Sequence, residues 1–429
     1  MHERIVLIES NTSGTGPLFV EAAKRIGVTP VLFAEDPSRY AFARQPGLEV
    51  VRQSCRSVGE IESRLEGLSW KLDIAGIYTS SEYFIETAGA LALGRNLPGA
   101  DPRAVRNCRN KWTQFNLLNA AGIGIPATRL ATTPAEAISA GRELGLPVVL
   151  KPCEGTGSVG VRRCDTPNEV TAHAAALLAM RTNERGFPMP PEILVQEYVN
   201  WPEFSAEMFS KRLLGITRKH VSEPPYFVET GHDFPLPIGE EDFHRLEQMF
   251  ARALDAVGLS WGPSHIEFRR HEDRMAIMEI NPRLAGGFIP ELIRLAYGYD
   301  VIEATLRSVL GAPVEWPSRQ ERYASIRFVL SQGNGTLSAV HLPELSGMAD
   351  IVDLRLYKNI GDHVAITHDF RDRIGHVIAA GAEPEAIAQS VETARNAVHV
   401  EVSPDVTCAP SLVGETTPDK ACPTPGKNP

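Results

Sequence analysis

Residues 278–283 read Met278-Glu279-Ile280-Asn281-Pro282-Arg283, and the motif His265-Ile266-Glu267 stands upstream of them. Both stretches alternate apolar and polar residues, which is typical of β-strands, and the charged residues between them predict a turn. The two strands would form a hairpin that places Glu267 and Glu279 side by side. Taken alone, this alternation also fits a hairpin with a solvated charged face.

The polar residues of this predicted hairpin have a chemistry in common. Glu267, Glu279 and Asn281 offer oxygen ligands, which suit Mg²⁺ and its work with substrate phosphates. Arg283 follows two residues after the asparagine, where a fixed cation can hold a phosphoryl group during its transfer. The motif therefore predicts a metal site with Arg283 as a catalytic residue beside it.

A glycine-rich loop lies upstream of the hairpin. The β-branched run Pro147–Pro152 carries Lys151, and the loop that follows contains Gly155, Gly157 and Ser158. Glycine permits close backbone approach, and successive N–H groups can form a nest for phosphates. The loop lacks the Gly-Lys-Ser/Thr ending of a Walker A sequence, and its lysine precedes the glycines, unlike the dinucleotide fingerprint. For the loop alone, a plain glycine-rich hairpin turn remains an alternative.

A third motif is the apolar run Ile193–Val199, which predicts a strand that ends in a polar linker. Glu197, Tyr198 and Val199 of this linker could present backbone groups to the edge of an adenine. Glu203 could then present a carboxylate to a ribose. This motif is weak evidence by itself, and the order of the motifs carries more weight.

The order is a strand with a lysine, a glycine-rich loop, a Glu-Tyr-Val linker, and then the Glu…Glu-x-Asn-x-Arg motif. It resembles the ATP-grasp superfamily, in particular the carboxylate–amine ligases that act on amino acids, over roughly residues 1–400. The resemblance implies an α/β ATP-grasp fold with three parts. These are an N-terminal parallel-sheet (pre-ATP-grasp) domain, an α+β lid subdomain and a C-terminal α+β lobe.

The expected domains follow from this resemblance and from the pattern of elements. Residues 1–100 alternate strands and helices, which predicts a parallel sheet with crossover helices. Residues 101–310 should form the ATP-grasp domain, with the lid at about 145–205, and residues 311–402 the C-terminal lobe. Residues 403–429 are rich in Pro, Thr, Lys and Gly, so we expect a flexible tail without chemistry.

The resemblance also implies roles for single residues, although a surface position for Lys111 and a structural role for His232 remain alternatives. Glu229 and His232 would fix the amino group of a substrate or transfer a proton, whereas Arg283 would stabilise the transferring phosphoryl group and the later tetrahedral oxyanion. The backbone of Gly286 and Gly287, which follows Arg283, could accept the substrate carboxylate near the γ-phosphate. The residues expected to contact ATP are Lys111, Lys151, Gly155, Gly157, Ser158, Glu197, Tyr198, Val199 and Glu203.

Composition fits a globular enzyme of this kind. The 429 residues are 43% apolar and 22% charged, enough for a large core, and the net charge of −10 argues against nonspecific nucleic-acid binding. No run of 18 apolar residues and no signal-peptide segment is present, so we expect a cytoplasmic protein without a membrane span. The six cysteines have no CxxC spacing, which indicates reduced thiols.

The expected function is an ATP-dependent ligase that joins a small carboxylate to a small amine through an acyl phosphate. At least one substrate would be an amino acid, and the pathway would belong to secondary metabolism. The resemblance implies ATP and two Mg²⁺ ions, with Mn²⁺ as a substitute, and leaves a homodimer open. The alternatives are a carboxylase resembling biotin carboxylase, although the chain has no Met-Lys-Met biotin-attachment segment, and a non-catalytic ATP-binding protein. The identities of the acid and the amine stay open.

Overall fold

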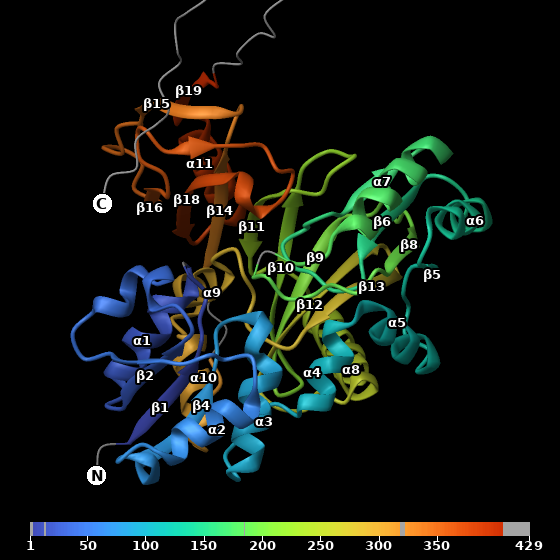
Figure 1. Ribbon diagram of the computed structural model, residues 1–429. Helices are drawn as coiled ribbons and strands as arrows, with labels where there is room; N and C mark the ends of the chain where they lie inside the picture. Colours follow the sequence, from blue (N-terminus) through green and yellow to red (C-terminus); the bar gives the residue numbers. More distant parts are fainter. Residues whose placement is uncertain (1–2, 13, 184, 318–321, 406–429) are drawn as a thin grey trace, which may run out of the picture.

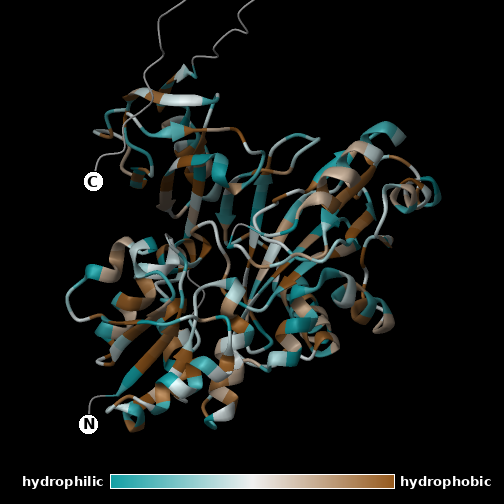
Figure 2. Ribbon diagram, viewed as in Figure 1, coloured by the Kyte–Doolittle hydropathy of each residue, from teal (hydrophilic) through white to brown (hydrophobic). Residues whose placement is uncertain are grey.

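The computed structural model describes residues 3–12, 14–183, 185–317 and 322–405 (Figure 1). Its N-terminal part is a parallel sheet ordered β3-β2-β1-β4, which Figure 2 shows as largely hydrophobic strands. The strands are β1 (Arg4–Ile8), β2 (Thr29–Ala34), β3 (Glu49–Arg52) and β4 (Ile74–Tyr78). Their helices are α1 (Thr15–Arg25), α2 (Val58–Glu66) and α3 (Ile85–Gly94).

The strand β1 explains how this sheet is covered on both faces. Ile5 and Leu7 pack with α1 and with α10 (Val301–Val309), whereas Val6 and Ile8 pack with α2 and α3. Successive side chains of a strand point to opposite faces, so an unbroken apolar run requires helices on both sides. The carboxyl ends of these strands face the centre of the molecule (Figure 1).

The lid subdomain is an antiparallel sheet ordered β5-β8-β6-β7. Helices α6 (Pro134–Leu144) and α7 (Pro167–Ala179) share one apolar core with it. A capping box fixes the start of α7, because Thr166 and Glu169 each accept a hydrogen bond from the other's backbone N–H. The strands are β5 (Thr128–Ala131), β6 (Val148–Pro152), β7 (Arg162–Cys164) and β8 (Ile193–Glu197).

An eight-stranded sheet forms the centre of the molecule, in the order β13-β12-β9-β10-β11-β14-β18-β16, with antiparallel pairing throughout. Helices α4 (Pro102–Arg109), α5 (Lys111–Ala120) and α8 (Glu240–Val257) pack on one end, and α9 (Ile289–Tyr297) packs near the middle. The strands are β9 (Glu203–Phe209), β10 (Arg212–Val221), β11 (Glu229–Phe234), β12 (Pro263–His271), β13 (Arg274–Asn281), β14 (Tyr323–Leu330), β16 (Ile351–Leu356) and β18 (Arg373–Gly381).

The C-terminal lobe completes this sheet and adds a small one ordered β17-β15-β19. Helix α11 (Pro384–Asn396) shares a core with β18. The small sheet contains β15 (Gly335–His341), β17 (His363–Val364) and β19 (His399–Pro404). Short 3-10 helices are η1 (Pro37–Arg39), η2 (Ala41–Arg44), η3 (Lys71–Asp73), η4 (Glu82–Phe84) and η5 (Phe370–Asp372).

The fold class expected from the sequence is confirmed: a parallel N-terminal sheet, an α+β lid and a C-terminal α+β lobe are all present. The expected tail begins inside β19, where Ser403 and Pro404 pair with β15, and residues 406–429 lie outside the described residues. Within the described ranges, no helix has the length and hydropathy needed to cross a bilayer. Cys55, Cys108, Cys153 and Cys164 are free and buried, and the other two cysteines lie in the undescribed tail.

Candidate active site

One pocket lies between the lid sheet and the eight-stranded sheet and holds about 830 Å³ of space, part of it open to solvent. All the residues that the sequence analysis assigned to ATP line this pocket. Glu229, Glu267 and Glu279 line it as well, whereas Asn281, His232, Arg283, Gly286 and Gly287 do not. The fold therefore brings together motifs that are far apart in the sequence.

The glycine-rich loop forms one wall of this pocket. Gly157, Ser158 and Gly160 have φ values of 63°, 64° and 74°, in the left-handed region that glycine adopts without cost. A serine in this region is uncommon, and such strained backbone often marks a functional site. Lys111 reaches the loop from the start of α5, because its Nζ donates to the Gly155 carbonyl at 3.1 Å.

The linker end of the pocket contains a buried acceptor without a partner. Gln196 donates from Nε2 to the Thr128 hydroxyl at 3.0 Å, but its Oε1 has no hydrogen-bond partner among the described residues. A free acceptor in a pocket suits an amino donor such as that of adenine. Glu203 is bound instead by Arg269, whose guanidinium lies 2.9 Å away and also donates to the Val199 carbonyl.

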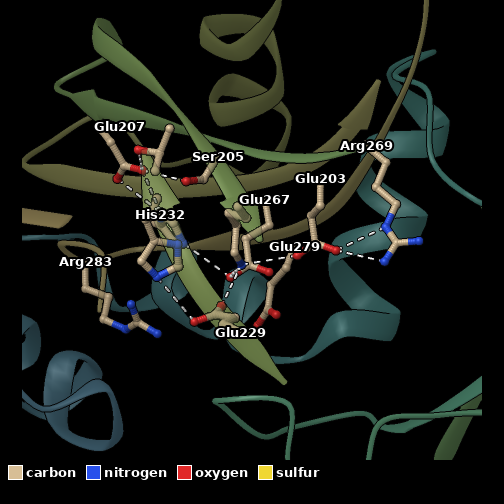
Figure 3. Close-up of polar contacts among 12 residues, drawn as sticks. Glu203, Ser205, Glu207, Glu229, His232, Glu267, Arg269, Glu279 and Arg283 are labelled. Carbon is tan, nitrogen blue, oxygen red and sulfur yellow. Dashed lines mark hydrogen bonds and ion pairs between the residues drawn. The ribbon is translucent and has the colours of Figure 1, made fainter. Parts of the chain in front are cut away.

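The predicted hairpin exists as β12 and β13, and its register pairs Glu267 with Glu279 and His265 with Asn281. Figure 3 shows the side chains of Glu229, Glu267 and Glu279 gathered in one place. No three His, Cys, Asp or Glu side chains of the described residues form a metal-binding group. The donor set is two carboxylates and the buried Asn281 amide, all of which offer oxygen, so it fits Mg²⁺ completed by phosphate oxygens.

A buried lysine lies among the carboxylates. The Nζ of Lys219 lies 2.7 Å from Glu229, 3.1 Å from Glu267 and 3.3 Å from Glu203. Burial alone would lower the pKa of Lys219, but these carboxylates raise it well above its usual value. The same ammonium holds the pKa of Glu229 and of Glu267 well below the usual range, against the effect of burial.

Two further lysines face the pocket with different electrostatics. Lys111 forms an ion pair with Glu279 at 2.8 Å. Lys151 lies over the ring of Phe115 at 5.0 Å, and no ion pair of its own is found among the described residues. Burial, followed by the Lys111 ammonium, lowers the pKa of Lys151 to about 8. A desolvated lysine without an ion-pair partner among the described residues is suited to bind an anionic phosphate.

A polar network centres on His265 of β12, and Figure 3 labels its members Ser205, Glu207 and Glu267. The Nδ1 of His265 lies 3.0 Å from Glu207 and its Nε2 lies 3.2 Å from Glu267. Ser205 and Thr217 donate to Glu207 at 2.7 and 3.1 Å. Burial alone would lower the pKa of His265, but Glu207 and then Glu267 raise it to about 9. The charged imidazole of His265 therefore orients the carboxylate of Glu267.

His232 has the opposite electrostatics. Neither of its ring nitrogens has a hydrogen-bond partner among the described residues, and Nε2 lies 3.7 Å from the Glu229 carboxylate. Burial lowers the pKa of His232 to about 3, so the imidazole is neutral near pH 7. Gly287 lies against this ring, since a Cβ built there would collide with Nε2. Burial thus makes this imidazole a weak base, and the nearby Glu229 carboxylate is the group that most favours its protonated form.

Arg283 is anchored by a residue that the sequence analysis did not identify. Glu82, in η4 of the N-terminal domain, accepts hydrogen bonds from Nε of Arg283 at 2.8 Å and from its Nη2. Arg109 lies 3.3 Å from the same carboxylate. Burial alone would raise the pKa of Glu82, but Arg283 and then Arg109 lower it to about 2. The N-terminal domain thus fixes the arginine next to the pocket.

Lys219, Glu82 and Gln196 are the site residues that sequence reasoning missed. Each lies in a short polar stretch in or beside a strand, and no fixed spacing connects it to a motif. Burial of a polar side chain would have been the informative signal, but burial is not readable from one sequence.

Known protein families match two parts of this chain, and one of them includes most of the residues that line the pocket. Residues 144–291 match the ATP-grasp domain family, and residues 327–403 match the L-amino acid ligase C-terminal domain 2. The uncharacterized protein y4rH of Sinorhizobium fredii is 34% identical over 94% of this chain and 84% of its own length. The chain therefore belongs to the ATP-grasp family. Within it, the C-terminal domain is that of the L-amino acid ligases, so the protein is an ATP-grasp ligase.

More distant relatives carry names of ligases. Human carnosine synthase 1 is 26% identical over 88% of this chain and 48% of its own length. Alanine–anticapsin ligase of Bacillus amyloliquefaciens is 26% identical over 54% of this chain and 53% of its own length. The chain thus spans about half the length of these two relatives. An L-amino acid ligase from Bacillus licheniformis has the same fold, with a TM-score of 0.77, 20% identity, and coverage of 94% of this chain and 99% of that one.

Proposed function

We propose that this enzyme joins a small carboxylic acid to a small amine, at least one of them an amino acid, with hydrolysis of ATP to ADP and phosphate. The observation that carries the proposal is the single pocket in which the glycine-rich loop, the lysines and the hairpin carboxylates meet. Arg283 and His232 lie beside it, where the acid and the amine would react.

In the first step, an oxygen of the substrate carboxylate attacks the γ-phosphorus of ATP, and ADP leaves. The product is an acyl phosphate. Lys111 and Lys151 bind the phosphates of ATP, and their charges offset the negative charge of the transfer. Glu267, Glu279 and Asn281 would hold two Mg²⁺ ions, or Mn²⁺ in their place, and the ions would offset negative charge on the phosphates.

In the second step, the amine nitrogen attacks the acyl carbon, the C–O bond to phosphate breaks, and the amide forms. Arg283 stabilises the oxyanion of the tetrahedral intermediate, as a fixed cation can in a site that excludes water. Glu229 orients the amine by its carboxylate. His232 helps to place the amine or takes the proton that its nitrogen loses, and in the second role it depends on the Glu229 carboxylate, 3.7 Å away, which favours the protonated imidazole.

The proposal also covers the substrates, the location of the enzyme in the cell and its oligomeric state. The names of the relatives favour an amino acid as one substrate, and the sequence does not select the second. We further propose that the enzyme works in the cytoplasm, in secondary metabolism, and that it forms a homodimer. Gly286 leaves space beside Arg283 for the substrate, whereas the ring of His232 fills the position where a side chain of residue 287 would lie.

The proposal is tested by ADP release in a panel of amino acids and small acids, with and without bicarbonate, followed by mass analysis of the products. Amide formation in step with ADP release, and without need of bicarbonate, is the expected result. ADP release that depends on bicarbonate and yields no amide would show a carboxylase. No turnover with any pair would favour the non-catalytic alternative.

A further inference from the structure

A short segment of the C-terminal lobe, residues 366–373, contacts both halves of the proposed reaction site. It contains η5 (Phe370–Asp372) and ends at the first residue of β18, Arg373. One end touches the glycine-rich loop, which lines the nucleotide pocket, and the other touches Glu229. We refer to residues 366–373 as the bridging segment.

The bridging segment is held rigidly by two buried carboxylates. Asp372 accepts hydrogen bonds from the backbone N–H and hydroxyl of Thr367, at 2.6 and 2.8 Å, and from the N–H of His368 at 3.0 Å. Asp369 accepts from the N–H of Arg371 at 2.9 Å. Charge-assisted bonds of this kind are strong, so the segment moves as one unit.

Phe370 carries the contact with the glycine-rich loop. Its backbone N–H donates to the Gly157 carbonyl at 3.2 Å, and a Cβ built on Gly157 would collide with its ring. Nearby, the ring of His368 stacks on that of Tyr226, with centroids 3.8 Å apart. The guanidinium of Arg162, just after the loop, lies 5.8 Å from the centroid of the Tyr226 ring. The phenyl ring of Phe370 is 38% exposed, so burial in the lobe's own core does not explain its position.

Arg373 carries the contact with the amine side. Its guanidinium forms an ion pair with the Glu229 carboxylate, and its Nε donates to the Glu229 carbonyl at 3.2 Å. The guanidinium also lies 4.0 Å from the centroid of the Phe328 ring, which limits its freedom. Arg373 and Lys219 together fix the orientation of the carboxylate that would receive the amine.

We propose that the bridging segment couples closure of the glycine-rich loop over ATP to the order of the amine site. The inference rests on the proposed ligase function. Because Phe370 and Arg373 belong to one rigid unit, a change at Glu229 moves the loop, and an open loop loosens Glu229. The coupling keeps water from the acyl phosphate until the amine is in place. Phe370 and Arg373 are positioning residues, since neither forms or breaks a bond.

The test uses the full-length protein with two variants, Phe370→Ala and Arg373→Ala. Phe370→Ala should raise the KM for ATP about tenfold, the factor that about 1.4 kcal/mol of lost contact gives. It should also raise the ratio of ADP to amide above one, whereas a merely structural defect would lower both products together. The control is Ile360→Ala, because Ile360 is a 65% exposed apolar residue of the same lobe, outside the segment.

Arg373→Ala decides whether coupling exists, because Arg373 has no described contact with the loop. Hydrogen exchange of residues 154–161 in the presence of ATP and Mg²⁺ should become faster in this variant, although the loop itself is unchanged. Arg373→Lys, which keeps the charge, should restore part of the protection. If Arg373→Ala does not fold, the KM for the amine in Phe370→Ala decides in its place, and it should rise.

A double-mutant cycle isolates the contact between ring and loop. Gly157→Ala forces a collision with Phe370, and Phe370→Ala should relieve part of its effect on the KM for ATP. Unchanged loop exchange in Arg373→Ala, an unchanged KM for the amine in Phe370→Ala, or additive effects in the cycle would each overturn the inference. Loop exchange is measured without turnover, so it stays informative even if the wild type forms no amide and the proposed function fails.

Discussion

The substitution Glu82→Gln tests whether the N-terminal domain holds Arg283 in place. The carboxyl of Glu82 is buried, and its pKa falls from 4.5 to about 2 because of Arg283 and Arg109. At about 1.4 kcal/mol per unit, this shift corresponds to about 3 kcal/mol of stabilisation at neutral pH. Glutamine keeps the size of the side chain but removes the charge, so two partly buried guanidinium groups lose their shared partner.

We expect Glu82→Gln to lower the free energy of unfolding by about 3 kcal/mol at pH 7, as measured by chemical denaturation. The folded-state pKa of Glu82 is depressed, so its contribution is present above about pH 4.5 and is lost as the pH falls toward about 2. The difference between wild type and variant should therefore shrink over this range. The turnover number should fall by about a hundredfold, because Arg283 loses its position, with a smaller change in the KM for ATP.

Glu86→Gln is the matched control for this substitution. Glu86 forms an ion pair with Arg106 at 2.6 Å, but both side chains are exposed, so its loss should cost less than about 1 kcal/mol and leave turnover unchanged. Equal effects of the two substitutions on stability and turnover would refute the reasoning. So would a Glu82→Gln enzyme with normal turnover, because Arg283 would then not depend on the N-terminal domain.

Three further predictions concern the pocket. Glu279→Ala should lower turnover by at least about a hundredfold while circular dichroism stays unchanged, and a normal rate with unaltered Mg²⁺ dependence would remove Glu279 from the metal site. Lys151→Ala should weaken ATP binding by about 1.5–3 kcal/mol in calorimetry. In the wild type, ATP affinity should fall as the pH rises above about 8, the pKa of Lys151, and ATP binding in this range should be accompanied by proton uptake. If Lys151→Ala showed the same pH dependence of ATP affinity, another group would be responsible for that dependence. His232→Ala should keep ADP release while the amide yield falls, whereas Arg283→Ala should abolish both products. Equal loss of ADP and amide in His232→Ala would place His232 in the first step.

The sequence predicted the elements whose patterns are local. The paired strands of Glu267 and Glu279 followed from alternation around a charged turn, and the register of β12 and β13 confirms that they are neighbours. The strand of Lys151 and the parallel N-terminal sheet were predicted for the same reason, since apolar periodicity depends only on nearby residues.

The contacts between domains could not be predicted in this way. Glu82 reaches Arg283 across about half of the chain length, and Lys219 lies in β10 while its partners come from three other strands. A single charged residue in a strand reads as a solvent-facing position. The burial of Lys219 among carboxylates results from tertiary packing. No fixed spacing in the sequence connects this lysine to its partners.

The choice between ligase and carboxylase depends on which nucleophile meets the acyl phosphate. Both reactions use the same phosphoryl chemistry, so the nucleotide pocket alone does not separate them. The match of residues 327–403 to the L-amino acid ligase C-terminal domain favours the ligase. The neutral imidazole of His232 beside Glu229 is consistent with an amine as the second substrate.

The most direct measurement follows an isotope from the acid substrate. With ¹⁸O in its carboxylate, an acyl phosphate transfers one labelled oxygen to inorganic phosphate when the amine displaces it. We predict one ¹⁸O atom in the phosphate for each amide formed, one ADP per amide, and no effect of bicarbonate. Unlabelled phosphate, or labelled phosphate without an amide product, would contradict the proposed mechanism.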